Sequence, residues 1–210
     1  MFAVLPAMTI FISVLIFIGV TMKVRSRKYG KDFEDFITEE RNANALKSKP
    51  IEENRFFTPD LTLFPIKPYA NGDDLVSRQQ IEVVQRGSKK MIRFDAPMTN
   101  LELKHKYGTV NLEKITEHEE NFFTFIYAVN SWAEAMITAE DFDGAEKALK
   151  GGIKCGAETS KTYTMLADIY FRLNKKSEMR ELHEAVKNSN MPAQEKTLDY
   201  IGEYCAKMGA

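Results

Sequence analysis

The chain opens with an apolar stretch that carries no charge. Residues 2–22 include only three polar side chains, Thr9, Ser13 and Thr21. A helix rises about 1.5 Å per residue, so about 20 residues span a hydrocarbon core of about 30 Å. Pro6 lies in the first turns, where its missing N–H is tolerated. The pattern predicts a single transmembrane helix over residues 2–22.

A basic cluster follows this stretch directly. Its members are Lys23, Arg25, Arg27, Lys28 and Lys31. Positive charge beside a transmembrane end favours the cytoplasmic side, so we expect the N-terminus outside and the rest of the chain inside the plasma membrane. A cleaved signal peptide is the alternative, but it calls for a basic region before the apolar one. The cluster either binds anionic lipid headgroups or serves only as a topology signal.

Residues 23–47 are predicted to form a charged stalk. Acidic residues follow the basic cluster, and Phe33, Phe36 and Ile37 occur among them at helical spacing. We expect a short amphipathic helix that ends near Ala45. Its narrow apolar side either docks on the domain or a partner, or the segment is a solvated stalk.

Residues 48–98 are predicted to be a connector interrupted by prolines, which end helices and favour extended geometry. The segment is too apolar for a free linker, and we expect its large side chains to be buried against the helical domain. These are Phe56, Phe57, Leu61, Leu63, Phe64, Ile66 and Tyr69. A short helix from Asp74 to Arg86, with Leu75, Ile81, Val83 and Val84 inward, and a brief strand at Met91 and Ile92 are also predicted.

Helices dominate the predicted domain over residues 99–210. Thr99 and Glu102 fit a capping box, and Gly108 ends the helix that they begin. Asn111 is expected to cap a longer helix from Leu112 to Ala139. That helix has a wide apolar face, which needs cover on more than one side. The residues of this face are Phe122, Phe123, Phe125, Ile126, Val129, Trp132 and Met136.

Residues 126–204 match themselves at an offset of 34. Under this shift Trp132 falls on Leu166 and Tyr200, Ala133 on Ala167, Met136 on Tyr170 and Tyr204, Ala145 on Met179, and Leu149 on His183. The period, the small residues and the turn from Asp141 to Ala145 resemble the tetratricopeptide repeat family. Met179 and His183 depart from the family's pattern. An ordinary helical bundle with accidental periodicity is the alternative.

The resemblance implies an all-α superhelix of antiparallel helix pairs whose A helices line a groove for a partner's peptide. The groove residues that it implies are Tyr127, Asn130, Glu134, Lys161, Thr164, Asp168 and Arg172. The family's clamp for a terminal carboxylate is absent, because Glu134 and Asp168 occupy its positions, so a ligand there should be neutral or basic. These residues are alternatively ordinary solvated positions. The layout also resembles mitochondrial import receptors and membrane-anchored repeat proteins of Gram-positive bacteria, of which we favour the latter.

Composition supports no particular chemistry. The net charge is −1, and the aromatic residues are not interleaved with a basic stripe, so nucleic acid is not an expected partner. Cys155 and Cys205 form no disulfide framework, and the three histidines lack metal-ligand spacing. We therefore expect no metal, cofactor, small-molecule substrate or enzymatic activity. The predicted function is a membrane-tethered adaptor for unidentified proteins; the alternative is a structural or assembly subunit of a larger membrane complex.

Overall fold

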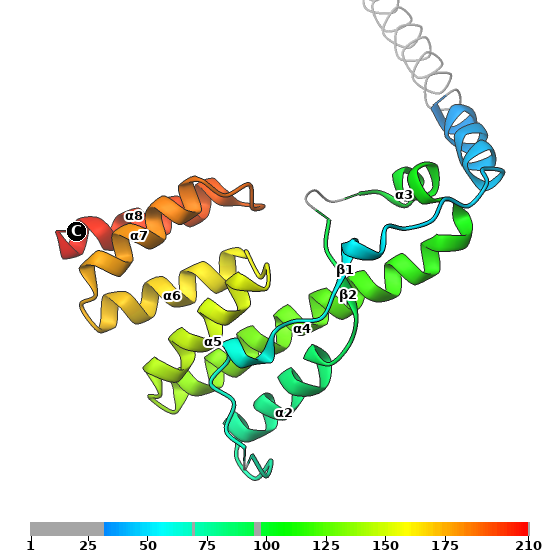
Figure 1. Cartoon of the computed structure of the whole chain (residues 1–210). Helices are drawn as coiled ribbons and strands as arrows, with labels where there is room; N and C mark the ends of the chain where they lie inside the picture. The colour runs from blue at the N-terminus through cyan, green and yellow to red at the C-terminus, as the bar shows by residue number, and fades with distance from the viewer. Residues whose placement is uncertain (1–31, 69, 95–97, 210) are drawn as a thin grey trace, which may run out of the picture. The chain divides into compact units, whose positions relative to one another are not determined.

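The computed structural model describes residues 32–68, 70–94 and 98–209, and these are predominantly helical (Figure 1). The all-α class predicted from the sequence is confirmed for this part of the chain. The predicted anchor over residues 2–22 and the whole basic cluster from Lys23 to Lys31 lie outside the described residues. Among the residues that are described, no helix is both long and apolar enough to cross a membrane.

The chain divides into two compact units. The first takes in residues up to Ile51 together with Pro97–Glu113, and the second takes in Glu52–Ala96 and Lys114–Ala210. The boundary between units therefore differs from the predicted boundary at residue 98. Most of the connector groups with the repeat helices, and the helix that begins after Thr99 groups with the stalk.

The first unit contains a helix over residues 32–44, α3 (Asn100–Tyr107) and η3 (Thr109–Asn111). The capping box at the start of α3 is present as predicted, with Thr99 and Glu102 bonded to each other's backbone N–H. Gly108 ends α3 at φ 81°, and a Cβ there would lie 2.8 Å from the Cα of Ser48. A residue other than glycine would be strained at this position.

Polar bonds join the segments of the first unit. The amide of Asn111 donates to the carbonyls of Lys49 and Tyr107, at 2.6 and 2.9 Å. The ammonium of Lys104 lies 2.6 Å from the carboxylate of Glu40. These bonds attach the stalk helix and the start of the connector to α3.

The second unit is built on helices, and short turns join the successive helices from α4 to α8 (Figure 1). The helices are α2 (Leu75–Gly87), α4 (Leu112–Thr138, whose first two residues belong to the first unit), α5 (Phe142–Lys154), α6 (Ser160–Arg172), α7 (Lys176–Lys187) and α8 (Gln194–Met208). The connector adds η1 (Glu53–Arg55), β1 (Phe56–Phe57), η2 (Leu61–Leu63) and β2 (Met91–Ile92). In the predicted strand, Met91 and Ile92 pair antiparallel with Phe57 and Phe56.

Helix boundaries in this unit recur at an interval of 34 residues. Helices α4 and α6 end at 138 and 172, α5 and α7 begin at 142 and 176, and α6 and α8 begin at 160 and 194. The turn between the helices of each pair recurs as well. Glu140 and Asn174 both have positive φ, at 60° and 53°. The turn therefore repeats as a backbone conformation although the side chains differ.

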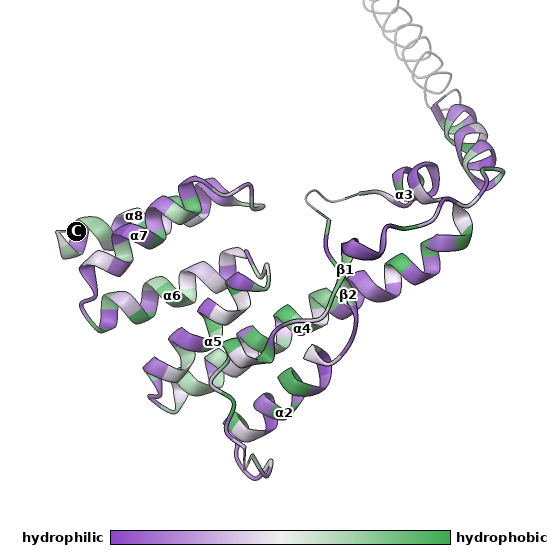
Figure 2. Cartoon of the chain, viewed as in Figure 1, coloured by the Kyte–Doolittle hydropathy of each residue, from purple (hydrophilic) through white to green (hydrophobic). Residues whose placement is uncertain are grey.

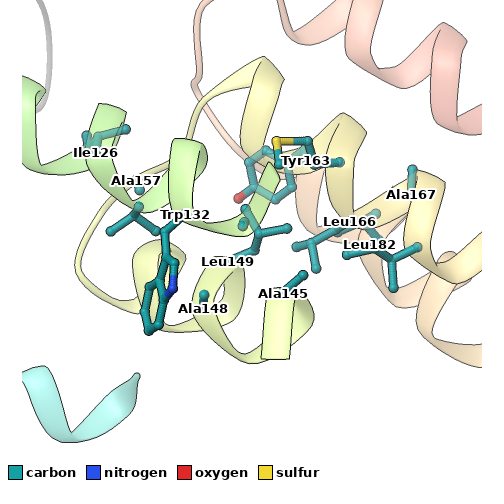
Figure 3. Packing of buried hydrophobic residues seen from close by; sticks show 14 of the residues in the cluster. Ile126, Trp132, Ala145, Ala148, Leu149, Ala157, Tyr163, Leu166, Ala167 and Leu182 are labelled. Atoms are coloured by element: carbon teal, nitrogen blue, oxygen red, sulfur yellow. The ribbon is translucent and has the colours of Figure 1, made fainter. Parts of the chain in front are cut away.

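The core lies between the helix pairs, where small and large residues face each other (Figure 3). Trp132, Leu149 and Leu166 are at most 1 % exposed, and Ala145 and Ala167 are fully buried beside them. Each buried large side chain contributes about 1.5–3 kcal/mol. The apolar residues line the inner sides of α4 to α7, whereas the outer sides are mostly hydrophilic (Figure 2). His183 is half-buried rather than a core residue, and Leu182 is buried in its place.

The connector covers α4 and α5 with the side chains that the sequence analysis singled out. Phe64 is buried and its ring meets that of Phe125 edge-on at 5.8 Å. Leu61, Leu63 and Ile66 are partly buried against the same core. One expectation is wrong: Leu75 is 50 % exposed because α2 turns Val76 inward instead. Tyr69 lies outside the described residues, so its burial stays a prediction.

One part-buried ion-pair cluster joins α5 to the turn between α6 and α7. Glu146 accepts from Lys150 and Lys175 at 2.6 Å each. Burial raises the pKa of Glu146, but the hydrogen bonds and charges of the two lysines outweigh burial, so the pKa lies below its ordinary value.

A substitution at Gly151 tests the docking of the connector. A Cβ there would lie 2.9 Å from the carbonyl oxygen of Leu63 and 3.2 Å from the Phe64 ring. Gly151→Ala should lower the free energy of unfolding by about 1–3 kcal/mol in urea denaturation followed by circular dichroism. The control is Gly202→Ala in α8, where nothing lies within 4 Å and alanine should add up to about 1 kcal/mol. Equal effects at the two sites would contradict the docking.

Glu146→Gln should reveal the ion-pair cluster through the pH dependence of stability. The folded-state pKa of Glu146 is depressed, so its contribution is present above the unfolded pKa of about 4.3 and is lost as pH falls through the folded value. The variant should be less stable than the wild type by about 1–3 kcal/mol at pH 7, and the difference should shrink towards pH 3. Thermal unfolding at a series of pH values measures this, and a constant difference would refute the assignment.

Candidate functional site

Three helices of the second unit lie next to each other and present one continuous surface. Asn130 of α4 accepts from Thr162 of α6 at 3.1 Å, and Ser160 of α6 lies 2.7 Å from Thr197 of α8. Towards the surface, Lys161 of α6 pairs with Glu134 of α4 at 2.9 Å. We call the exposed side of these helices the A-helix face. It comprises Phe123, Tyr127, Glu134, Lys161, Thr164, Asp168, Phe171, Tyr200 and Tyr204.

Most of the predicted groove residues lie on this face. Tyr127 is 72 % exposed, and Glu134, Lys161 and Asp168 are exposed. Thr164 is half-buried, with its hydroxyl donating to the carbonyl of Lys161. Tyr127 and Glu134 are seven residues, or two turns, apart on α4, and Lys161, Thr164 and Asp168 are three and four residues apart on α6, which places them on one side of each helix.

Two of the predicted groove residues, Asn130 and Arg172, instead make contacts within the protein. Asn130 is 5 % exposed and lies between α4 and α6, so a partner cannot reach it. Its side chain holds the two helices together. Arg172 is exposed, but its guanidinium lies over the Phe142 ring at 4.7 Å and 3.9 Å from Glu140. Arg172 is therefore directed towards the turn that precedes α5.

The structure adds an aromatic group that the sequence analysis did not place at the site. Asp168 accepts from the hydroxyls of Tyr200 and Tyr204, at 2.6 and 2.9 Å. Phe171 stacks on Tyr204 with ring centroids 4.4 Å apart. We call Asp168, Phe171, Tyr200 and Tyr204 the Asp168 cluster. The 34-residue match had aligned both tyrosines with core residues, but α8 buries Thr197 and Ile201 instead, which turns Tyr200 outward.

The two carboxylates of the A-helix face differ electrostatically. Glu134 has a lysine at 2.9 Å, so its charge is compensated. Asp168 is bonded to neutral hydroxyls, and within residues 32–68, 70–94 and 98–209 it belongs to no ion pair. The hydrogen bond to Asp168 raises the pKa of Tyr200, followed by the bond to Tyr204 and burial, so Tyr200 stays a donor at neutral pH. Asp168 is thus a fixed, uncompensated negative charge.

A hollow of about 760 Å³ lies elsewhere in the second unit, between the connector and the end of α5. Its lining mixes Arg55, Arg93 and Lys154 with acidic residues and Cys155. Burial raises the pKa of the Cys155 thiol, so it is a packed cysteine and not an activated nucleophile. Among the described residues, no three His, Cys, Asp or Glu side chains are grouped to hold a metal ion.

Comparison with known proteins gives no relative to set beside this arrangement. No protein-family model, curated protein or solved structure matches the chain. The description of the candidate site therefore rests on the contacts of this chain alone.

Thr162→Val tests the polar bond that sets α4 beside α6. The substitution keeps the shape of the side chain but leaves the buried oxygen of Asn130 without its donor. We expect a loss of about 1–3 kcal/mol in the free energy of unfolding. Thr164→Val, two residues further along α6 and half-buried, should change it by less than about 0.5 kcal/mol. Urea denaturation of both variants measures the difference, and similar losses would count against a special role for Thr162.

Proposed function

We propose that this protein is an adaptor that binds other proteins on its A-helix face. The observation that carries the proposal is the gathering of exposed aromatic side chains there. Phe123, Tyr127 and Tyr200 are 59, 72 and 37 % exposed, and every exposed large aromatic residue described in the second unit lies on α4, α6 or α8. Rigid aromatic side chains supply contact area at low entropic cost and dominate many protein interfaces.

The proposed class is a tetratricopeptide-like repeat. It is supported by the 34-residue recurrence of helix boundaries and of the turn at Glu140 and Asn174. Buried Ala133 and Ala167 at equivalent positions are also typical of such repeats. In that class the A helices form the binding surface. The proposal places the partner's segment across α4, α6 and α8.

The proposed location is the cytoplasmic face of the plasma membrane. It is supported by the sequence alone, through the apolar residues 2–22 and the basic residues that follow them. A tether of this kind raises the local concentration of the domain around membrane partners, so modest contacts on the A-helix face suffice for function.

Site-specific photocrosslinking in cells tests the A-helix face. A photoreactive phenylalanine analogue at Tyr127 should give adducts with one or a few proteins. The same analogue at Leu75, a 50 % exposed apolar residue of α2 away from this face, is the control and should give none. Adding Phe123→Glu should abolish the adducts formed at Tyr127. Adducts that are equal at both positions, or that are unaffected by Phe123→Glu, would rule out the proposed face.

A structural subunit of a membrane complex is the second candidate, and one observation favours it. Phe33, Phe36 and Ile37 of the stalk helix are 65, 49 and 39 % exposed. An apolar side of this kind on a short helix is typical of a permanent interface. Adducts formed from Phe36, but not from Tyr127, in the crosslinking experiment would support this second function.

A further inference from the structure

We propose that the partner of the A-helix face presents a basic segment whose arginine or lysine side chain binds Asp168. This inference rests on the proposed function and names the chemistry of its ligand. Its starting point is the contrast between Glu134, which Lys161 compensates, and Asp168, which is bonded only to tyrosine hydroxyls.

The carboxylate of Asp168 is held in one orientation. Both tyrosine hydroxyls donate to the same oxygen, Oδ1, and the two hydroxyls lie 3.1 Å from each other. Asp168 is exposed, and its Oδ2 forms no hydrogen bond in the part of the chain that the structure describes. The second oxygen is therefore available to accept from an incoming cation. A fixed carboxylate loses little entropy when it binds, which favours affinity.

The rings of the Asp168 cluster suit a cationic side chain. Tyr200 meets Tyr204 edge-on at 5.1 Å and remains 37 % exposed, so part of its ring is open beside the carboxylate. A guanidinium can stack on such a ring while it donates to the carboxylate. Arginine is therefore the better of the two candidates. Phe171, stacked on Tyr204, holds the second ring in place.

Two cations of the chain that lie near the cluster have neighbours other than the Asp168 carboxylate. Arg172, one helical turn after Asp168, lies over Phe142 and near Glu140. Lys207 lies over the Tyr204 ring at 5.5 Å and 3.5 Å from Glu203. Neither forms an ion pair with Asp168, and Lys196, one helical turn before Tyr200 on α8, forms none with it either, so among the described residues the charge of Asp168 stays open to a partner's cation. Tyr127 and Phe123, farther along the same face, provide the apolar contact that a basic segment alone would lack.

Selection from a displayed library of random 12-residue peptides tests the inference. The target is the full-length chain reconstituted in nanodiscs, with empty nanodiscs used to remove lipid binders. Selected peptides should be enriched in arginine. Their affinity, measured by fluorescence anisotropy, should fall about tenfold for Asp168→Asn and change less than twofold for Glu134→Gln. The two variants remove one negative charge each from the same face and differ in whether that charge is already paired.

Tyr200→Phe is a second variant that retains the ring and the carboxylate. It removes one of the two hydrogen bonds that orient Asp168, and binding should weaken by about two- to fivefold. Circular dichroism should give the wild-type spectrum for Asp168→Asn and Tyr200→Phe, which shows that loss of binding is not loss of fold.

The remaining outcomes separate the inference from the proposed function. Peptides that are neutral or acidic and that lose affinity on Tyr127→Ala would overturn the basic ligand but retain the binding face. Arginine-rich peptides that bind Asp168→Asn as well as wild type would overturn the role of Asp168. Failure to select any peptide would overturn both proposals.

Discussion

The close approach of neighbouring helices at residues with little or no side chain is the constraint on which the second unit depends. A Cβ on Gly152 of α5 would lie 3.1 Å from Val129 of α4, and Ala133, Ala145 and Ala167 are fully buried. Short helices of 12 or 13 residues are marginal in isolation and need such contacts to be stable. Ala133 and Ala167 recur at the 34-residue interval, whereas Ala145 and Gly152 correspond to the larger Met179 and Val186, so the close approach is only partly repeated from one pair to the next.

In the described part of the chain, the pairs α4–α5 and α6–α7 leave an apolar side at each end that other segments cover. The connector covers one end with Phe64 and its neighbours, and α8 packs against α6 and α7 at the other. This division explains why a segment rich in proline is also rich in large apolar residues. It also explains why α8 has one exposed side: no further pair follows in the described part of the chain to cover Tyr200.

Local signals in the sequence predicted most elements of the fold. The capping box at Thr99, the glycine stop at Gly108 and the turn at Asp141 depend on a few adjacent residues, and the structure has all three. The apolar period placed Trp132, Leu166 and Tyr170 in the core correctly, but it also placed Phe123 on the covered face of α4, and Phe123 is 59 % exposed. The predicted burial of Leu75 was wrong. Leu75 and Val76 are adjacent in the sequence, so a small rotation of α2 about its axis buries Val76 and exposes Leu75.

The candidate site was harder to predict because its geometry depends on tertiary neighbours. The positions of groove residues in the tetratricopeptide family predicted that Asp168 and Asn130 are both exposed. Asp168 is exposed, but Asn130 is buried between α4 and α6, where it accepts a hydrogen bond from Thr162. The 34-residue alignment matched Tyr200 and Tyr204 with core positions. In the described part of the chain, no helix after α8 covers these two side chains. Their spacing of four residues, one turn on α8, was the available signal that both side chains point to the same side.

The residues that face the two carboxylates explain why the charge on Asp168 is uncompensated. Between α4 and α6, Lys161 lies opposite Glu134, and the facing charges neutralise each other. Between α6 and α8, Asp168 accepts from the hydroxyls of Tyr200 and Tyr204, and the position equivalent to Lys161 is occupied by Glu195. Neutral hydroxyls orient the carboxylate but bring no positive charge to it. A glutamate at the position of the lysine thus leaves Asp168 as an oriented negative charge at the surface.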